Sequence, residues 1–289
     1  MEQNVGDVTN GREIVRPAAL PRDLLPRVLS GAVLAVVALA GNWAGHIPFA
    51  CLVLLVALVM SWEWSGIVRG FGIDAVLVVQ SLVVAVAVGL TAWGAPHLGV
   101  TLVLLGAIVV YPMAPRVLAG LSALGVVYVG LPAIALIWLR GADGLGAAAI
   151  FFIFAIVWTT DTFAYLCGRA IGGPKLWPAM SPRKTWAGTL GGIAFAAVAG
   201  AIFATQVPGS APMMLALVAV LLSIVAQAGD LAESALKRAF DVKNASDLIP
   251  GHGGFMDRMD GIVTAASLAA LIAAVRGAQT PAQSLLFWS

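Results

Sequence analysis

Long apolar runs separated by short polar connections repeat along almost the whole chain after residue 22. About 20 helical residues cross the roughly 30 Å hydrocarbon core of a bilayer, so runs of this length predict transmembrane helices. Nine spans are predicted, at residues 24–41, 47–66, 74–93, 97–112, 117–139, 145–170, 186–206, 211–238 and 258–277. The first, second and fourth are short, so a count of eight is also consistent with the pattern.

The same runs exclude two other architectures. A transmembrane β-barrel would show segments of about ten residues with alternating polarity, whereas runs such as AVLVVQSLVVAVAVGL do not alternate. The chain is 61% hydrophobic and only 10% charged, with a mean hydropathy of +0.98, so it lacks the polar surface of a soluble domain. The predicted fold class is an all-α integral membrane protein, a polytopic helical bundle.

Positive charges are distributed unequally over the predicted connections. Of the sixteen Lys and Arg residues, the nine-span topology places fourteen on one side and only Arg140 and Arg276 on the other. Because Lys and Arg are enriched in cytoplasmic loops, the N-terminus is expected in the cytoplasm and the C-terminus outside. Residues 1–22 are polar and contain two prolines, which is typical of a cytoplasmic tail and not of a cleaved signal.

The two halves of the chain differ in where polar residues lie. In residues 23–144 the connections, such as EWSGIVRGFGID and YPMAPR, are short and carry little chemistry, so this half is interpreted as a transmembrane scaffold. In residues 145–289 two longer cytoplasmic loops are predicted, at 169–185 and 239–257, and ionisable residues enter the apolar helices. A charge inside a membrane span is costly and normally marks a site or a pathway. The second half is therefore the expected catalytic region.

The first polar constellation runs from Thr159 to Gly188. Asp161 lies within the sixth predicted span, and the following loop ends in Ser181, Lys184 and Thr185 just before an apolar helix. Hydroxyls, cations and the free amides of a helix N-terminus together suit a phosphate group. The simpler interpretation, that the cations of this loop anchor a helix to lipid headgroups, is equally consistent with this segment alone.

The second constellation is QAGDLAESALKRAF. Asp230, Glu233, Ser234 and Lys237 occupy one stripe of a helix, at spacings of three and four residues. Two carboxylates in a membrane helix need cations, which Lys237, Arg238 or a bound metal could supply. A purely structural ladder of salt bridges within the helix is the alternative.

The third constellation is LIPGHGGFMDRMDG. Asp257 and Asp260 give the ninth predicted helix an acidic first turn, which favours the helix dipole, so capping alone could explain them. Capping does not require the preceding PGHGG, whose glycines allow another group to approach the backbone closely.

All three constellations fall on the predicted cytoplasmic face, where acids and cations are present in similar numbers. Carboxylates that bind Mg²⁺ beside cations that bind phosphate are the arrangement that phosphoryl and nucleotidyl transfer require. A secondary transporter or ion channel is the alternative from another class. It would be expected to spread its charges towards the membrane midplane and over both halves, and here they crowd one edge of one half.

The segment SALKRAFDVKNASDLIPGHGGFMDRMDG, together with DTFAY, GR and SPRKTWAG upstream, resembles the signature of the phosphatidate cytidylyltransferase family. The resemblance implies the reaction of CTP with phosphatidic acid to give CDP-diacylglycerol and pyrophosphate, with Mg²⁺ as cofactor and a homodimer as the assembly. One or two divalent ions are expected, with a possible second, monovalent ion. A cytidylyltransferase acting on another lipid phosphate is the nearest alternative.

The resemblance also implies roles for individual residues. Asp230 and Asp257 are the expected metal-binding carboxylates, and Lys237, Arg238 and Asp260 the other catalytic residues. Asp161 and Glu233 are expected to support them as counter-ions or orienting groups. The expected phosphate-binding residues are Ser181, Lys184, Thr185, Ser234, Lys243, His252 and Arg258.

Two positions depart from the family pattern. Asn244 and Ala187 stand where relatives usually carry Asp and Glu, so the acids that would orient Lys243 and the Ser181–Thr185 loop are missing, and Asp241 or Asp247 could substitute for the first. Neither departure removes an expected metal ligand. The bilayer is the expected environment, specifically the inner, cytoplasmic membrane with the site on its cytoplasmic side, and no nucleic acid partner is expected.

Overall fold

The structure is a computed structural model that describes residues 24–249 and 253–288. The predicted tail at 1–22 and His252 lie outside the described residues. The helices are α1 (Leu24–Ala44), α2 (His46–Arg69), α3 (Ala75–Ala92), α4 (Pro96–Met113), α5 (Ala119–Arg140), α6 (Gly144–Ile171), α7 (Trp186–Gln206), α8 (Pro212–Ala239), α9 (Met256–Arg276) and α10 (Pro281–Leu286). The strands are β1 (Lys175–Trp177) and β2 (Ser181–Thr185). The predicted all-α bundle is confirmed.

Eight helices in the described part of the chain, α2 to α9, are long and apolar enough to cross a membrane. The first predicted span corresponds to α1, of which Leu29–Ala44 forms an apolar helix shorter than the others. Each of the other eight predicted spans matches one helix to within a few residues at either end. The short helix α10, which packs on α9 and α6, was not predicted, because six residues carry too little periodicity.

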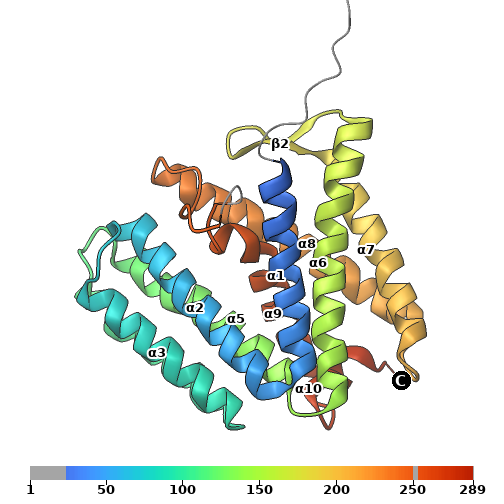
Figure 1. Ribbon diagram of the computed structural model, residues 1–289, viewed down its shortest axis with the longest axis horizontal. Helices are drawn as coiled ribbons and strands as arrows, with labels where there is room; N and C mark the ends of the chain where they lie inside the picture. Colours follow the sequence, from blue (N-terminus) through green and yellow to red (C-terminus); the bar gives the residue numbers. More distant parts are fainter. Residues whose placement is uncertain (1–23, 250–252, 289) are drawn as a thin grey trace, which may run out of the picture.

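Consecutive helices run alternately up and down, so their connections gather at two opposite ends of the bundle (Figure 1). The upper end in Figure 1 holds the β1–β2 hairpin, the turn between α2 and α3 and the segment that joins α8 to α9. The lower end holds α10 and the α5–α6 turn. The three polar constellations therefore meet at one end of the molecule, which is the predicted cytoplasmic end.

Local side-chain caps fix where several helices begin. The Asp74 carboxylate accepts the Leu77 N–H at 2.7 Å at the start of α3, and Asp143 accepts the Gly146 N–H at 2.7 Å at the start of α6. Thr185 does the same for α7, accepting the Gly188 N–H at 3.1 Å. Such caps satisfy backbone donors that have no partner within the helix, so the ends of the apolar runs coincide with the ends of the helices.

Small residues let α6 and α7 approach each other closely. A Cβ atom placed on Gly188 would lie 2.6 Å from the carbonyl oxygen of Ala164, and one on Gly192 would lie 2.9 Å from that of Thr160. Membrane helices lack a hydrophobic driving force for association and depend on this kind of close contact. The packing sets the position of β2, which leads directly into α7.

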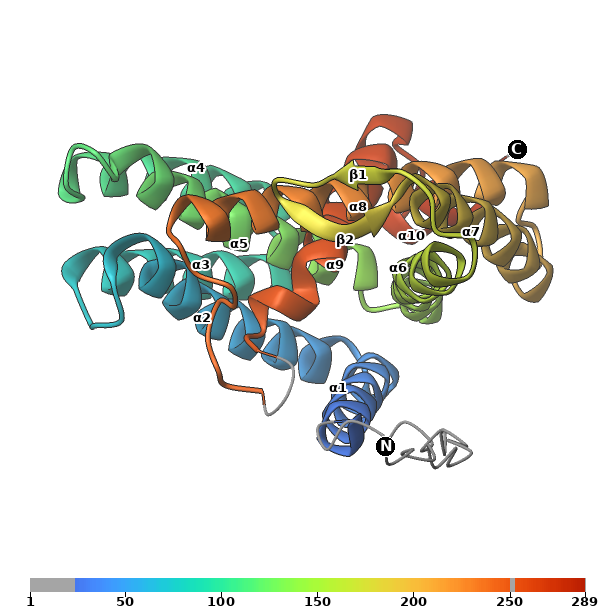
Figure 2. The same cartoon turned by 90° about the horizontal axis from the view of Figure 1, so that it is seen from above.

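The predicted loop at 169–185 is partly ordered secondary structure. Helix α6 extends to Ile171, and β1 and β2 then form an antiparallel hairpin that pairs Lys175 with Thr185 and Trp177 with Ser181. Seen from above, the hairpin lies over the ends of α6 and α8 (Figure 2). The second predicted loop, 239–257, is slightly shorter in the structure, because α8 ends at Ala239 and α9 begins at Met256. The described residues between these helices are irregular apart from an isolated bridge between Ile249 and Gly253.

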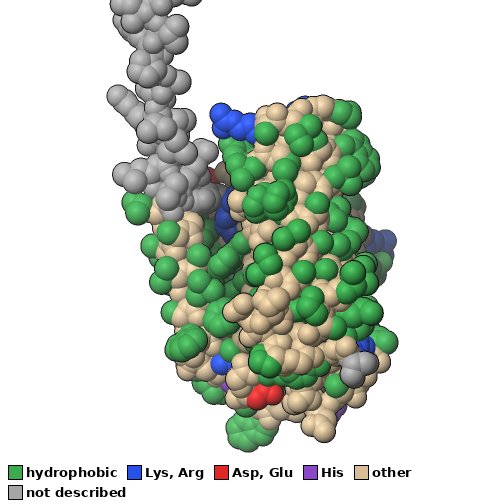
Figure 3. Space-filling view, turned by 90° about the vertical axis from the view of Figure 1, so that its right-hand side faces the viewer, with side chains coloured by type: hydrophobic (Ala, Val, Ile, Leu, Met, Phe, Trp, Pro, Cys, Tyr) green, Lys and Arg blue, Asp and Glu red, His purple; other side chains and the backbone are tan. Residues whose placement is uncertain are grey.

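The outer surface is suited to lipid. Figure 3 shows a face on which hydrophobic side chains extend over the whole height, while prominent Lys and Arg side chains project near its upper end. Exposed apolar residues such as Ile108, Val198 and Leu271 lie on the outside of α4, α7 and α9. An exposed apolar surface of this kind is expected where helices contact the bilayer.

Candidate active site

An ion pair joins the hairpin to α8. The Lys184 ammonium, on β2, lies 2.5 Å from the Asp230 carboxylate oxygen Oδ2, and the other oxygen of Asp230 accepts the Ser234 hydroxyl at 3.4 Å. The Lys184 and Asp230 side chains are 24% and 36% exposed, but the Nζ atom of Lys184 is itself buried, so the ammonium group is shielded from solvent. Thus the first and second polar constellations are in direct contact.

Lys237 joins α8 to α9. Its ammonium group donates to the Glu233 carboxylate at 2.9 Å and also to Oδ1 of Asp257. The Glu233 and Asp257 side chains are only 1% and 6% exposed, and that of Lys237 is 12% exposed. One cation therefore balances two buried acids on different helices, which places the second and third constellations side by side.

Asp257 also organises the backbone around it. Its Oδ2 atom accepts the N–H of Ala245 at 2.9 Å and that of Gly254 at 2.8 Å. A Cβ atom on Gly253 would lie 2.8 Å from the same oxygen, and φ at Gly253 is +83°, a region that favours glycine. The sequence interpretation left open what approaches this glycine-rich turn, and in the structure a carboxylate of the chain itself does so.

Two further acids complete a cluster around Asp230. Asp260 interacts electrostatically with Asp230, Glu233 and Asp161, and Asp161 interacts with Lys184 and Arg258 as well. Helices α8 and α9 meet here at Gly229, where a Cβ atom would lie 2.9 Å from the Asp260 carbonyl oxygen. The acids that the sequence singled out thus share one region, and cations are interspersed among them.

The remaining predicted phosphate-binding residues surround this cluster. Ser181 lies in β2, and Thr185 is buried, with its hydroxyl oxygen used to cap α7. Arg238, Lys243 and Arg258 are exposed. Within residues 24–249 and 253–288 the side chains of these three cations form no hydrogen bond or ion pair, which leaves them free to meet an anion. At the departure from the family pattern, Asn244 donates to Asp247 at 3.5 Å, so an acid does lie beside the residue that follows Lys243.

Sequence reasoning missed Glu63. It was read as part of a polar connection with little chemistry, but it lies within α2, fully buried, and its carboxylate accepts backbone N–H groups at the start of α9. Tyr128 on α5 was missed as well; its hydroxyl lies 3.4 Å from Glu233 and its ring packs on Trp64. The signal was available for Glu63, because an acid within an apolar run is rare and costly.

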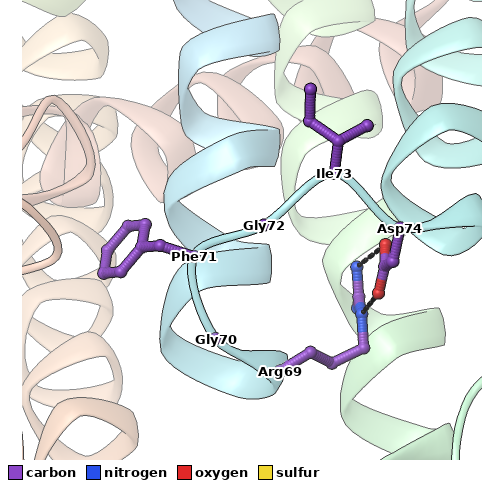
Figure 4. A pocket seen from close by; sticks show the side chains of 6 residues that line it. All are labelled: Arg69, Gly70, Phe71, Gly72, Ile73 and Asp74. Atoms are coloured by element: carbon purple, nitrogen blue, oxygen red, sulfur yellow. Dashed lines mark hydrogen bonds and ion pairs between the residues drawn. The ribbon is translucent and has the colours of Figure 1, made fainter.

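A small hollow of about 250 Å³ lies at the α2–α3 turn and is lined by residues Arg69 to Asp74 (Figure 4). The Arg69 guanidinium donates to Asp74 at 2.7 Å and to Ser122 at 3.0 Å. Burial raises the pKa of Asp74, but the hydrogen bonds from Arg69 and from the Leu77 amide lower it further, so the net pKa lies below its usual value. Because Arg69 is already paired and ties α2 to α3 and α5, this hollow is a structural junction.

The donor atoms near Asp230 and Asp257 are of the type that Mg²⁺ prefers, since they are carboxylate and hydroxyl oxygens. No group of three or more His, Cys, Asp and Glu residues in the described part of the chain is close enough to hold a metal by itself. Mg²⁺ is usually bound through one or two carboxylates plus substrate phosphates and not by an all-protein cage. The residues present therefore fit a metal ion that binds together with a phosphate ligand.

Comparison with known proteins identifies the family. The model of the cytidylyltransferase family matches residues 25–275, which is nearly all of the chain. The chain belongs to the cytidylyltransferase family. It is thus a nucleotidyltransferase, which decides between the enzyme and the transporter or channel that the charge pattern alone had left open.

Curated relatives of this membrane cytidylyltransferase share the same name. Phosphatidate cytidylyltransferase from Brucella suis biovar 1 is 37% identical over 280 residues, covering 92% of this chain and 99% of the relative. The protein of that name from Brucella abortus (strain 2308) shows the same identity and coverage. That from Bacillus subtilis (strain 168) is 42% identical over 142 residues, 49% of this chain and 53% of the relative.

Proposed function

We propose that the protein transfers CMP from CTP to phosphatidic acid, giving CDP-diacylglycerol and pyrophosphate, at the cytoplasmic interface of the inner membrane. The observation that carries the proposal is the meeting of cations and acids from β2, α8 and α9 at one end of an apolar bundle. The names of relatives that align over almost the whole chain support the choice of substrates. The multi-span bundle supports a reaction in which one substrate is a lipid.

The reaction forms one bond and breaks one. An oxygen of the lipid phosphate attacks the α-phosphorus of CTP, and the bond from that phosphorus to the bridging oxygen of the β-phosphate breaks, releasing pyrophosphate. No general base is needed, because a phosphate monoester already carries the attacking charge near neutral pH, its second pKa being about 6. The barrier is then largely electrostatic repulsion between two anions, which fixed cations lower.

The cations of the site have different roles in this reaction. The exposed Arg238, Lys243 and Arg258 bind phosphate oxygens of the incoming substrates. Lys184, whose ammonium group is buried beside Asp230, exchanges that carboxylate for a substrate phosphate. Lys237 stays between Glu233 and Asp257 and holds α8 against α9. His252 keeps its predicted role of donating a hydrogen bond to a substrate phosphate. The protein is also proposed to act as a homodimer.

Asp230 and Asp257 would hold Mg²⁺ in this scheme. The bound metal would supply positive charge that neutralises the phosphates and stabilises the leaving pyrophosphate. Asp230 offers a partly exposed carboxylate for this purpose. Asp260 and Asp161 lie in the same acidic cluster as Asp230.

The experiment is the incorporation of labelled CTP into CDP-diacylglycerol by the purified protein in reconstituted membranes. Asp230→Asn and Asp257→Asn are expected to reduce Mg²⁺-dependent turnover by about 100-fold or more, the effect of removing one electrostatic contact to developing charge. Asp143→Asn is the matched control: an exposed Asp that caps the start of α6 at the opposite end of the bundle, a role that Asn performs as well. It should retain wild-type turnover.

The outcomes separate the two parts of the proposal. A wild-type protein that makes no CDP-diacylglycerol, or that prefers another lipid phosphate in a parallel assay, would refute the substrate assignment. An active wild type with near-normal activity in either Asn variant would refute the metal assignment.

A further inference from the structure

We infer that Glu63, on α2, is a positioning residue that holds the α9 turn bearing Asp257 in place for the reaction. The inference rests on the proposed function. Glu63 lies more than 180 residues from its partners in the sequence, in the half of the chain that the charge pattern marked as scaffold. Its contacts connect that half to the site.

The Glu63 carboxylate is saturated with donors from the segment that joins α8 to α9. Its Oε1 atom accepts the Ser246 hydroxyl at 2.5 Å and the Phe255 N–H at 2.9 Å. Its Oε2 atom accepts the Met256 N–H at 2.7 Å. The side chain is fully buried, so these three donors replace the water that a carboxylate would otherwise require.

Helix α9 depends on this distant acid for its N-terminal cap. The residue before the helix is Phe255, whose side chain makes no capping hydrogen bond. The first N–H groups of a helix have no partner inside it, and the N-terminus carries a partial positive charge. Glu63 satisfies two of these groups and places a negative charge at that end of the dipole. In the described residues it forms no ion pair with Lys, Arg or His, so the helix end is its main electrostatic partner.

Glu63 and Asp257 accept hydrogen bonds from successive backbone amides of the turn that begins α9. Asp257 accepts the N–H groups of Ala245 and Gly254, and Glu63 accepts those of the next two residues, Phe255 and Met256. Successive residues of a single turn are therefore fixed by two carboxylates from different helices. A shift of Glu63 would move the turn and, with it, Asp257.

Gly254 shows how closely the two elements approach. A Cβ atom at this position would lie 2.9 Å from Cδ of Glu63 and 3.0 Å from Cβ of Ala245. The second glycine of the GG pair is thus needed for the contact with Glu63, and the first for the contact with Asp257. Position 63 requires a side chain with two hydrogen-bond acceptor atoms, because all three of its partners donate.

The experiment compares Glu63→Gln with Ser61→Ala in the CTP incorporation assay and by hydrogen–deuterium exchange. Gln keeps the shape but replaces one acceptor with an NH₂ group that faces a backbone N–H. We expect kcat per folded enzyme to fall about 10- to 100-fold, as when a group that orients a catalytic ligand is removed. Exchange should rise in peptides spanning 244–257 and stay unchanged in α3 and α4. Ser61, buried on the same helix with a hydroxyl that has no partner in the described residues, should tolerate Ala without either effect.

A second variant tests whether the loss of kcat depends on how many contacts of Glu63 are removed. Ser246→Ala removes one donor and leaves both amide contacts of Glu63, so its loss of kcat should be smaller than that of Glu63→Gln. The inference is overturned if Glu63→Gln retains wild-type kcat, or if exchange rises equally in all helices, which would indicate a general role in folding. A wild-type protein without activity would instead refute the proposed function, and the exchange result would still report whether Glu63 fixes the turn.

Discussion

At the scale of single residues, the site is a chain of acid and base contacts across helices. Lys184 meets Asp230, and Lys237 lies between Glu233 and Asp257. The side chain of Lys237 is half as exposed as that of Lys184. A buried ion pair contributes little net stability when intact, but the loss of one partner leaves an unpaired buried charge. Replacing Lys237 is therefore expected to destabilise the fold strongly, in addition to any effect on catalysis.

Lys237→Met is expected to lower the free energy of unfolding by about 3–5 kcal/mol, since it leaves two buried carboxylates without their shared cation. Denaturant titration of the detergent-solubilised protein measures this change. Arg238→Met, at the exposed neighbouring position, should stay within about 0.5 kcal/mol of wild type. Equal stability of the two variants would show that Lys237 does not balance these acids.

At the scale of elements, close helix contacts set the geometry on which the site depends. Glycines bring α6 to α7 and α8 to α9 at the level of the polar residues. The caps of α3, α6 and α7 come from residues adjacent in sequence, whereas α9 is capped from α2. The local caps could be predicted from sequence, and the boundary at Trp186 was. The cap of α9 could not, because its acceptor comes from a helix that is distant in sequence.

Gly188→Ala is expected to destabilise the protein by about 1–3 kcal/mol, the usual cost of adding a methylene-sized group to a packed contact. The added Cβ would lie 2.6 Å from a backbone oxygen of α6, which cannot move without separating the helices. Gly89→Ala, at an exposed helix position where a Cβ atom meets nothing within 4 Å, should instead stabilise the protein by up to about 1 kcal/mol. Thermal unfolding in detergent distinguishes the two, and a stable Gly188→Ala protein would contradict the importance of this contact.

At the scale of the whole molecule, the bundle separates a polar end from an apolar body. Among the described residues, the helix ends and connections at the upper end in Figure 1 carry most of the Lys and Arg residues, and those at the opposite end carry only Arg140 and Arg276. Arg140 is buried, donating to the Asn42 carbonyl oxygen. The charge bias predicted from sequence and the alternating helix directions therefore agree, and the site lies at the end that the bias assigns to the cytoplasm.

Single cysteines introduced at Lys243 and Ala142, in a background with Cys51→Ala and Cys167→Ala, test this orientation. Both positions are exposed, at opposite ends of the bundle. A membrane-impermeant maleimide applied to intact cells should label Ala142→Cys and reach Lys243→Cys only after permeabilisation. The reverse pattern would place the site outside.

The sequence by itself determined the fold class, the helix boundaries and the family, and it predicts the orientation, because apolar runs, fixed motif spacings and charge bias are local properties of the chain. It also named most residues that now share the site. Only the tertiary structure decided which of them are partners across elements: Lys184 with Asp230, Lys237 with Asp257, and Glu63 with the α9 turn. The pairings between different elements join residues from 20 to 193 positions apart. Such contacts depend on how helices pack, which no local pattern specifies.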